Sequence, residues 1–198
     1  MLYLIGYWFF KVFFKVFYSS KVFGIENVPS QGPGIIASNH TSNWDPPLIG
    51  SSIKRKDIYY LSKDELFRNF ILRFIFSRVH AFPVKRNRID KKALRKALEV
   101  IKKGHLLLIF PEGTRREKER YEDVFPGISF LARRTGVKVI PGFVLSPRLA
   151  KFFNKSVTVA FSEPIRFSDS EDDYDFAQRV MREIQKEEHK RAKNKELL

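Results

Sequence analysis

The chain has 198 residues, of which 43% are hydrophobic and 20 are phenylalanine, so it is long and apolar enough to form one folded domain with a sizeable core. Its 37 basic and 22 acidic residues give a formal net charge of +15, which predicts attraction to a polyanion, either a nucleic acid or an anionic lipid surface. The absence of cysteine excludes disulfides, thiolate nucleophiles and sulfur-ligated zinc, and leaves the compartment open.

Residues 1–23 are almost continuously aromatic and aliphatic, and we treat them as a membrane-associated helical region that precedes a domain at 24–198. The segment lacks the leading basic residues and the small-residue cleavage site of a secretory signal, so we expect it to be retained. As a helix it would be about 30 Å long, but its two central lysines favour a helix that lies in the membrane interface over one that crosses the bilayer. A buried core helix is the alternative. The polar residues recur every four positions as one narrow stripe, from which we expect the lysines to reach the lipid headgroups; the stripe comprises Tyr3, Tyr7, Lys11, Lys15 and Ser19.

Downstream, runs that suit strands alternate with patterns that suit helices. The first predicted elements are a strand at 32–40, a helix that begins at Pro46, a strand at 56–63, a helix at 64–78 and a strand at 80–84. The clearest helix follows, with Asp90 as the expected N-cap and Gly104 as the expected end. The remaining predicted elements are a strand from 105, a helix at 127–135, strands at 137–144 and 155–165, and an acid-started helix at 169–195.

This alternation predicts an α/β fold with a central, mostly parallel or mixed sheet flanked by helices, preceded by the amphipathic N-terminal segment. In such sheets the chemistry lies beyond the carboxyl ends of the strands. Two polar loops follow predicted strands, NHTSNWD at 39–45 and PEGTR at 111–115. We therefore expect the functional site in these loops.

The first loop places His40 five positions before Asp45. A histidine within reach of a carboxylate can act as a general base, because the carboxylate fixes the tautomer and stabilises the imidazolium that forms. The pattern is equally compatible with Asp45 capping the helix that begins at Pro46 while His40 merely ends a strand. The sequence has no G-x-S-x-G elbow and no phosphate-binding P-loop, and its four histidines are dispersed. What remains is a base that activates a hydroxyl of a substrate.

Both loops resemble motifs of the glycerolipid acyltransferases. NHTSNWD resembles the N-H-x4-D block and FPEGTR at 110–115 the F-P-E-G-T-R block, in the order and at the spacing found in the bacterial 1-acyl-glycerol-3-phosphate acyltransferases. Shorter elements of that family are similar to SKDEL at 62–66, AFPVKR at 81–86 and VIPGFV at 139–144, so the resemblance covers about residues 22–165.

The resemblance implies direct acyl transfer from acyl-CoA or acyl carrier protein to the free 2-hydroxyl of 1-acyl-glycerol-3-phosphate, which gives phosphatidic acid without a cofactor or a metal. His40 would be the general base and Asp45 would orient its ring. Three cations would hold the phosphate of the acceptor, and the F-P-E-G-T-R block would contact its glycerol backbone. These implied substrate-binding residues are Lys63, Arg86, Glu112, Gly113, Thr114 and Arg115.

As partners, the resemblance implies membrane lipids, the lysophospholipid acceptor and the acyl thioester, with a monotopic or peripheral location on the cytoplasmic face of the inner membrane. Another lysophospholipid or glycerol-3-phosphate is the alternative acceptor. A nucleic-acid-binding protein would also explain the charge, but its aromatic residues should interleave with basic ones on exposed strands, so we expect no nucleic-acid partner. A non-catalytic membrane-binding protein would explain residues 1–23 but not the pairing of His40 with Asp45.

Overall fold

The structure, a computed structural model, describes residues 2–85, 89–112, 127–145 and 156–193. In these segments seven strands form one sheet in the order β1-β7-β6-β2-β5-β3-β4. The strands from β6 to β4 run parallel, whereas β7 is antiparallel to β6 and β1 is parallel to β7. The predicted α/β class with a mostly parallel, mixed sheet is confirmed. The strands are β1 (Ser19–Phe23), β2 (Gly34–Ser38), β3 (Ile58–Lys63), β4 (Ala81–Val84), β5 (Leu106–Ile109), β6 (Val139–Leu145) and β7 (Ser156–Phe161).

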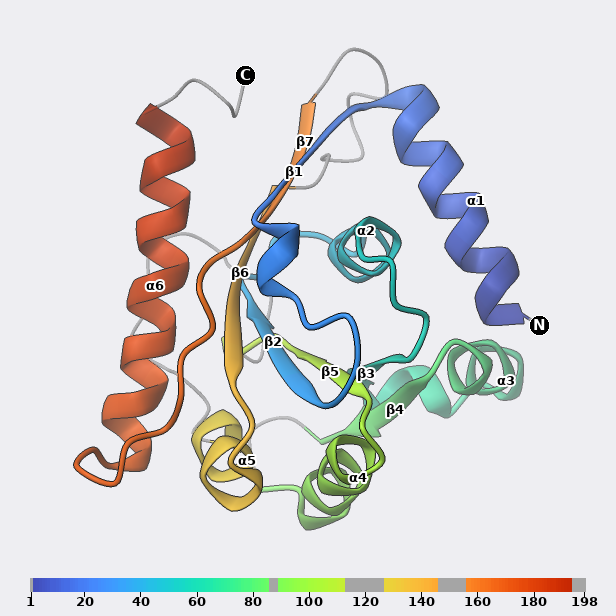
Figure 1. Cartoon of the computed structure of the whole chain (residues 1–198). Helices are drawn as coiled ribbons and strands as arrows, with labels where there is room; N and C mark the ends of the chain where they lie inside the picture. Colours follow the sequence, from blue (N-terminus) through green and yellow to red (C-terminus); the bar gives the residue numbers. More distant parts are fainter. Residues whose placement is uncertain (1, 86–88, 113–126, 146–155, 194–198) are drawn as a thin grey trace.

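Helices cover both faces of the sheet (Figure 1). One apolar cluster, which includes Phe14 and Leu48, joins α1 and α2 to one face, and α3 lies beside α1. A second cluster, which includes Leu131 and Phe176, joins α4, α5 and α6 to the opposite face. The helices are α1 (Leu2–Phe17), α2 (Asp45–Ser52), α3 (Phe70–Arg78), α4 (Lys91–Lys102), α5 (Gly127–Thr135) and α6 (Asp173–Lys193), with 3-10 turns η1 (Ile25–Asn27) and η2 (Asp64–Phe67).

β2 and β5 are neighbours at the centre of the sheet, and every residue of both strands is buried. Their continuous apolar sequences are typical of parallel strands that are covered on both faces. β2 leads into α2 on one face, whereas the next helix among the described residues after β5 is α5 on the opposite face. Adjacent strands that diverge in this way mark the position where α/β sheets bind ligands beyond the strand ends.

The N-terminal helix is shorter than predicted. α1 ends at Phe17, and residues 19–23 form an edge strand that pairs with β7, so the helical prediction for 1–23 is wrong over its last residues. The physical reason is the pair of serines at 19 and 20, which interrupts the apolar run before Val22 and Phe23, both good strand residues. No helix in the described segments has both the length and the apolarity needed to cross a bilayer.

The predicted polar stripe of α1 divides between two environments. Tyr3 and Tyr7 are buried, and the hydroxyl of Tyr7 donates a hydrogen bond to the carbonyl of Ile53 at 3.1 Å. Lys11 and Lys15 remain exposed. The tyrosines therefore attach α1 to the domain, whereas the expectation that the lysines reach lipid headgroups stays a prediction.

The helix predicted at 64–78 is also divided, into η2 and α3. Asn69 interrupts it as the N-cap of α3, and its side chain accepts hydrogen bonds from the N–H groups of Ile71 and Leu72 at 2.9 and 3.2 Å. An N-cap residue has extended backbone angles, so it separates the two helical segments. The apolar side chains of α3 do not enter the core: Phe70, Ile71, Leu72, Phe74 and Ile75 are exposed.

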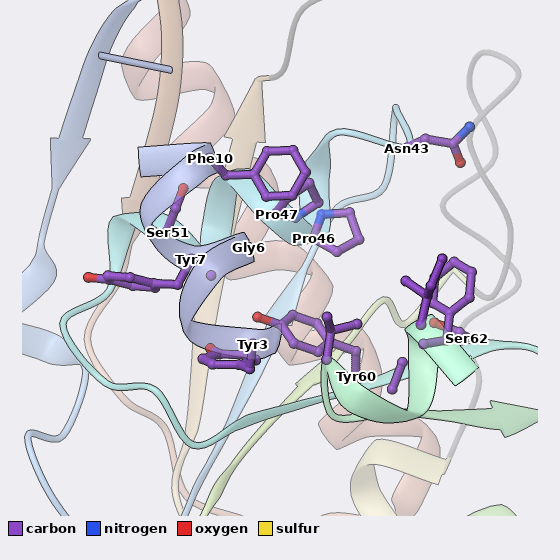
Figure 2. A pocket seen from close by; sticks show the side chains of 15 residues that line it. Tyr3, Gly6, Tyr7, Phe10, Asn43, Pro46, Pro47, Ser51, Tyr60 and Ser62 are labelled. Carbon is purple, nitrogen blue, oxygen red and sulfur yellow. The ribbon is translucent and has the colours of Figure 1, made fainter. Parts of the chain in front are cut away.

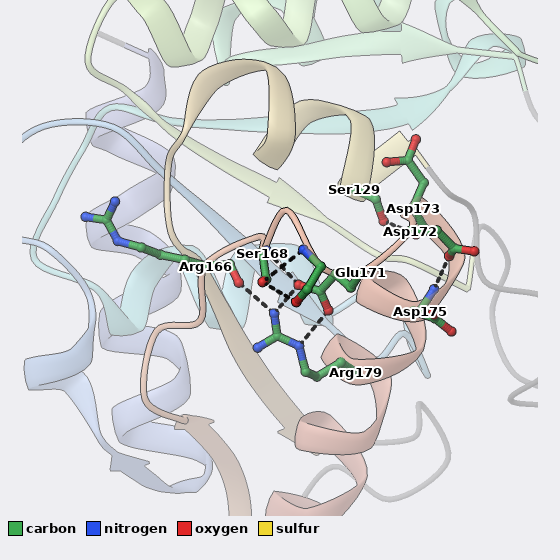
Figure 3. Close-up of polar contacts among 9 residues, drawn as sticks. Ser129, Arg166, Ser168, Glu171, Asp172, Asp173, Asp175 and Arg179 are labelled. Atoms are coloured by element: carbon green, nitrogen blue, oxygen red, sulfur yellow. Dashed lines mark hydrogen bonds and ion pairs between the residues drawn. The ribbon is translucent and has the colours of Figure 1, made fainter.

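The predicted N-cap of α4 is confirmed, whereas α6 begins at Asp173 and not at 169 as predicted. The carboxylate of Asp90 accepts hydrogen bonds from two backbone N–H groups in the first turn of α4. Asp172 does the same for α6, as Figure 3 shows. Arg179, in the second turn of α6, donates from Nε to Glu171 at 3.0 Å and so fixes the loop that precedes the helix.

A largely buried arginine holds together the loops at the amino ends of the central strands. Arg55 pairs with the carboxylate of Asp57 and donates to three loop carbonyls, those of Pro29, Gly32 and Gly104. Nδ1 of His105 lies 3.2 Å from the same carboxylate. The hydrogen bonds from Arg55 are the main reason that the pKa of Asp57 is lowered to about 2.

We expect Asp57→Asn to destabilise the fold at pH 7 by about 1 kcal/mol, a figure reduced because the carboxylate is partly exposed. Since the pKa of Asp57 is lower in the folded chain than its ordinary value of 3.8, this stabilisation is present above that value and is lost as the pH falls toward 2. Urea unfolding of the unaltered protein and of Asp57→Asn, at pH 7 and at about pH 3, measures the difference in their free energies of unfolding. A difference in stability that stays constant between these pH values would contradict the role of the carboxylate.

Candidate active site

The two predicted site loops leave the sheet side by side. β2 ends two residues before His40, and β5 ends directly before Phe110. Ala37 of β2 pairs with Ile109 of β5, so both loops begin at the same level of the sheet. They therefore lie where β2 and β5 diverge toward helices on opposite faces.

His40 and Asp45 form a buried pair in the first loop. Nδ1 of His40 lies 2.8 Å from Oδ2 of Asp45, and the two residues are 7% and 0% exposed. The same Oδ2 accepts hydrogen bonds from the backbone N–H groups of Thr41 at 2.6 Å and Ser42 at 2.8 Å. Three nitrogen atoms thus converge on one carboxylate oxygen.

These contacts distinguish the two roles that the sequence leaves open for Asp45. Trp44 occupies the N-cap position of α2 and makes no side-chain capping bond. Asp45 is the first helical residue, and its carboxylate turns back toward residues 40–42. The arrangement is that of an oriented imidazole, and the interpretation of Asp45 as a helix cap is wrong.

The tautomer of His40 follows from the hydrogen bonds of its partner. An ionised carboxylate has no proton to donate, and Asp45 already accepts from two backbone N–H groups. With Asp45 in this form, the hydrogen between the two side chains belongs to Nδ1 of His40. Nε2 then keeps a lone pair that can accept a proton, so the pair can act chemically as a general base.

Phe110 holds the ring of His40 from the second loop. The two ring centroids are 4.1 Å apart and the rings are nearly parallel, at 20°. Phe110 comes directly after β5, so the neighbouring strand restricts the rotation of the imidazole. Sequence reasoning assigned no role to this phenylalanine, because its apolar character does not distinguish it from the buried strand before it.

Sequence reasoning also assigned no role to Asn39, although this residue lies inside the first motif. It is 1% exposed, its Oδ1 accepts from the N–H of Val144 at 2.7 Å, and its Nδ2 donates to the carbonyl of Val144 at 2.9 Å. The last backbone pair between β2 and β6 joins Ser38 to Gly142. The amide side chain therefore extends the contact between these strands while the backbone turns toward His40. A buried amide at a strand end is the signal that could have revealed it.

Of the predicted substrate-binding residues, Lys63 and Glu112 lie in the segments that the structure describes. Lys63 ends β3 at the same edge of the sheet as the site loops, and its Nζ lies 3.1 Å from Oε1 of Glu65. Hydrogen bonds from its own backbone and from Lys63 lower the pKa of Glu65 to about 2. Glu112 follows β5 and is partly buried. The other four lie outside the described residues: Arg86, Gly113, Thr114 and Arg115.

The structure places the remaining histidines away from this pair. His80 stacks between Tyr3 and Tyr59, with centroid distances of 4.4 and 4.8 Å, and burial lowers its pKa. His189 lies exposed on α6. In the described part of the chain, no three His, Asp or Glu side chains form a group that could hold a metal ion.

A mostly apolar cavity of about 330 Å³ extends from the first site loop beneath α1 (Figure 2). Asn43 and Pro46 line it beside the His40–Asp45 pair, and Tyr3 and Tyr60 line it farther from that loop. Burial raises the pKa of Tyr3 to about 12 and that of Tyr60 well above its ordinary value, so both hydroxyls are uncharged near neutral pH. The cavity therefore suits an uncharged, apolar ligand group.

Comparisons with known proteins show which family the chain resembles. The sequence model of the family described as Acyltransferase matches residues 19–144, which include both site loops. A 1-acyl-sn-glycerol-3-phosphate acyltransferase of Bacillus subtilis is 27% identical over 151 residues, which are 75% of this chain and 75% of that protein. One of Streptococcus pneumoniae is 28% identical over 73% of this chain and 54% of its own length. A chloroplastic one of Arabidopsis thaliana is 34% identical over 63% of this chain and 35% of its own length.

A solved structure shares the fold. The crystal structure of the 1-acyl-sn-glycerophosphate acyltransferase PlsC from Thermotoga maritima matches with a TM-score of 0.70 and 25% sequence identity. The match covers 94% of this chain and 79% of that one. The similarity therefore extends over nearly the whole chain.

We expect Asn39→Ala to destabilise the fold by about 2 to 4 kcal/mol, because it leaves the buried N–H and carbonyl of Val144 without their partner. Asn27→Ala is the matched control, since Asn27 makes a single bond of the same kind, to the carbonyl of Phe161 at 2.9 Å. Urea unfolding of both variants compares their losses in the free energy of unfolding. A loss for Asn39→Ala no larger than that for Asn27→Ala would refute the double contact.

Proposed function

This chain belongs to the acyltransferase family, and on that premise we propose that it transfers an acyl group from an acyl thioester to the free 2-hydroxyl of 1-acyl-glycerol-3-phosphate, giving phosphatidic acid. The observation that carries the proposal is the buried pair of His40 and Asp45, 2.8 Å apart, at the divergence of β2 and β5. The names of the relatives support the choice of acceptor.

In the proposed mechanism, Nε2 of His40 removes the proton of the acceptor hydroxyl while the oxygen attacks the thioester carbonyl. The carbon–sulfur bond then breaks, and the leaving thiolate takes the proton from the imidazolium. Asp45 keeps Nδ1 protonated and stabilises the imidazolium between the two proton transfers. The acyl group moves in one step without an acyl-enzyme, which agrees with the absence of cysteine and of a G-x-S-x-G elbow.

We propose that cations at the same sheet edge hold the phosphate of the acceptor. Lys63 lies at that edge. Its exposed ion pair with Glu65 contributes little to the stability of the fold, so a phosphate can displace the carboxylate at low cost. Glu112 would accept a hydrogen bond from the glycerol backbone. The resemblance adds residues outside the described segments: Arg86 and Arg115 for the phosphate, and Gly113 and Thr114 for close approach of the backbone.

The cavity beneath α1 is the proposed site for an acyl chain. It begins beside the His40–Asp45 loop, so a thioester or ester group at the loop could extend its chain along the apolar lining. The donor is acyl-CoA or acyl carrier protein, and both bring the acyl group as a thioester. No cofactor is required by this mechanism, because the thioester supplies the activated acyl group.

We propose that α1 and α3 dock the enzyme peripherally on a membrane, at the cytoplasmic face of the inner membrane. Both helices expose large apolar side chains; Trp8 is 54% exposed and Phe70 is 72% exposed. The two helices are neighbours, and both line the apolar cavity. An acyl chain could pass from the bilayer toward the cavity with little exposure to water.

Replacing His40 with Ala should remove most turnover and leave the fold intact, because a general base contributes about 100- to 10,000-fold. Asp45→Asn should be similarly damaging, since an amide N–H opposite Nδ1 would move the imidazole hydrogen to Nε2. Release of thiol from acyl-CoA or acyl carrier protein with lysophosphatidate, in detergent, measures both effects.

Lys186→Ala is the control for that assay, because this exposed residue lies on α6 and pairs only with Glu183 among the described residues. Its turnover should equal that of the unaltered protein. Turnover of His40→Ala within a few-fold of this control would reject His40 as the base. Absence of thiol release by the unaltered protein would reject the proposed reaction itself.

Membrane docking should be lost when the outward faces of α1 and α3 become polar. Substitution is a cleaner test than deletion of α1, because Phe14 and Tyr7 of that helix are part of the buried core. The combined variant carries Trp8→Ser, Phe9→Ser and Val12→Ser on α1 and Phe70→Ser, Ile71→Ser and Phe74→Ser on α3.

In flotation with anionic vesicles, this variant should remain unbound at high salt, while Tyr174→Ser on α6 should float like the unaltered protein. High salt removes the contribution of the basic residues and so isolates the apolar contact. Flotation of the combined variant to the same extent as the Tyr174→Ser control would show that these two helices are not the docking surface.

A further inference from the structure

α1 contacts the loop that carries the His40–Asp45 pair. The ring of Trp44 stacks on Phe13, with centroids 5.6 Å apart and 13° between the ring planes. Phe10 and Phe14 meet the same indole edge to face, at 6.2 Å and at 77° and 85°. Phe10 lies one helical turn before Phe13 and Phe14, so the indole is held by a single face of α1.

The backbone of Trp44 is part of the site. Its N–H donates to Oγ of Ser42 at 3.2 Å, and its carbonyl accepts the first hydrogen bond of α2, from the N–H of Leu48 at 3.0 Å. Asp45 is the next residue. A shift of the indole would therefore move both the start of α2 and the backbone that carries the carboxylate.

α1 also holds the other end of α2. The hydroxyl of Tyr7 donates to the carbonyl of Ile53, which is the C-cap residue of α2, at 3.1 Å. Tyr7, Phe10 and the prolines at the start of α2 surround the same cavity (Figure 2). The short helix that begins with Asp45 is thus attached to α1 at both of its ends.

We infer that Trp44 is a positioning residue, through which the correct geometry of His40 and Asp45 depends on the placement of α1. The inference rests on the proposed function, and it assigns α1 a second task besides membrane docking. The outward surface of α1 at Trp8 and Val12 is separate from the side that holds Trp44, because both residues are exposed whereas Phe14 is buried. Docking and positioning can therefore be altered independently.

The test uses the full-length protein in detergent, where membrane attachment does not limit the rate. Trp44→Ala should lower kcat by about 10- to 100-fold and change KM by no more than about twofold, since small misplacements of catalytic groups reduce the chemical step. Trp44→Phe should restore most of the rate, because a phenyl ring can still stack on Phe13. Phe167→Ala is the matched control, since it removes a ring contact with Phe176 at 5.3 Å on the opposite face of the sheet.

A double-mutant cycle identifies the contact responsible. Phe13→Ala should lower kcat as Trp44→Ala does, and the double variant should lose little more than either single variant. Fully additive losses would overturn the inference, because they would mean that Trp44 and Phe13 act separately. A loss for Trp44→Ala no greater than that for Phe167→Ala, measured per folded molecule, would overturn it as well.

A spectroscopic measurement separates this inference from the proposed reaction. The Nδ1 proton of His40, hydrogen-bonded to Asp45, should give a downfield signal in the proton NMR spectrum that is absent from His40→Ala. Trp44→Ala should shift or broaden this signal, whereas Phe167→Ala should leave it unchanged. An unchanged signal in Trp44→Ala would overturn the positioning role even if the unaltered protein transferred no acyl group.

Discussion

One carboxylate oxygen organises the centre of this protein. Oδ2 of Asp45 receives the imidazole of His40 and two backbone N–H groups from the intervening loop, and Asp45 itself is fully buried. A buried carboxylate is costly unless it is hydrogen-bonded, so the loop must keep its shape for the charge to be tolerated. The loop is in turn attached to β6 through Asn39 and to α1 through Trp44.

The position of the site could be predicted because it depends on local sequence. Two polar loops after two apolar strands are visible in the residues alone, and so is the cap of α4 by Asp90. The functions of Asn39 and Trp44 could not be predicted in this way, because their partners, Val144 and Phe13, are distant in sequence. A side chain reveals such a role only when the fold has brought the partner to it.

Hydrophobicity alone was similarly ambiguous at the two helices for which we propose membrane docking, α1 and α3. The apolar residues at 70–76 indicated a helix, but their number could not distinguish a core face from an exposed one. In α1, Tyr3 and Tyr7 of the polar stripe are buried, while Trp8 and Phe9 are exposed. Polarity did not predict exposure at these four residues, because the helix is in contact with the domain on one side and presents an apolar surface on the other.

The strand that follows α1 has a consequence for the order in which the protein is made. Ser19 of β1 pairs with Ser156 of β7, so the edge of the sheet that adjoins α1 is completed only after most of the chain has been synthesised. Ribosomes add about 5–20 residues per second, and the apolar N-terminal helix therefore waits for many seconds without this anchor. A nearby bilayer would cover the apolar surface of this helix during that time. The nascent chain could then complete its sheet while already bound to the membrane.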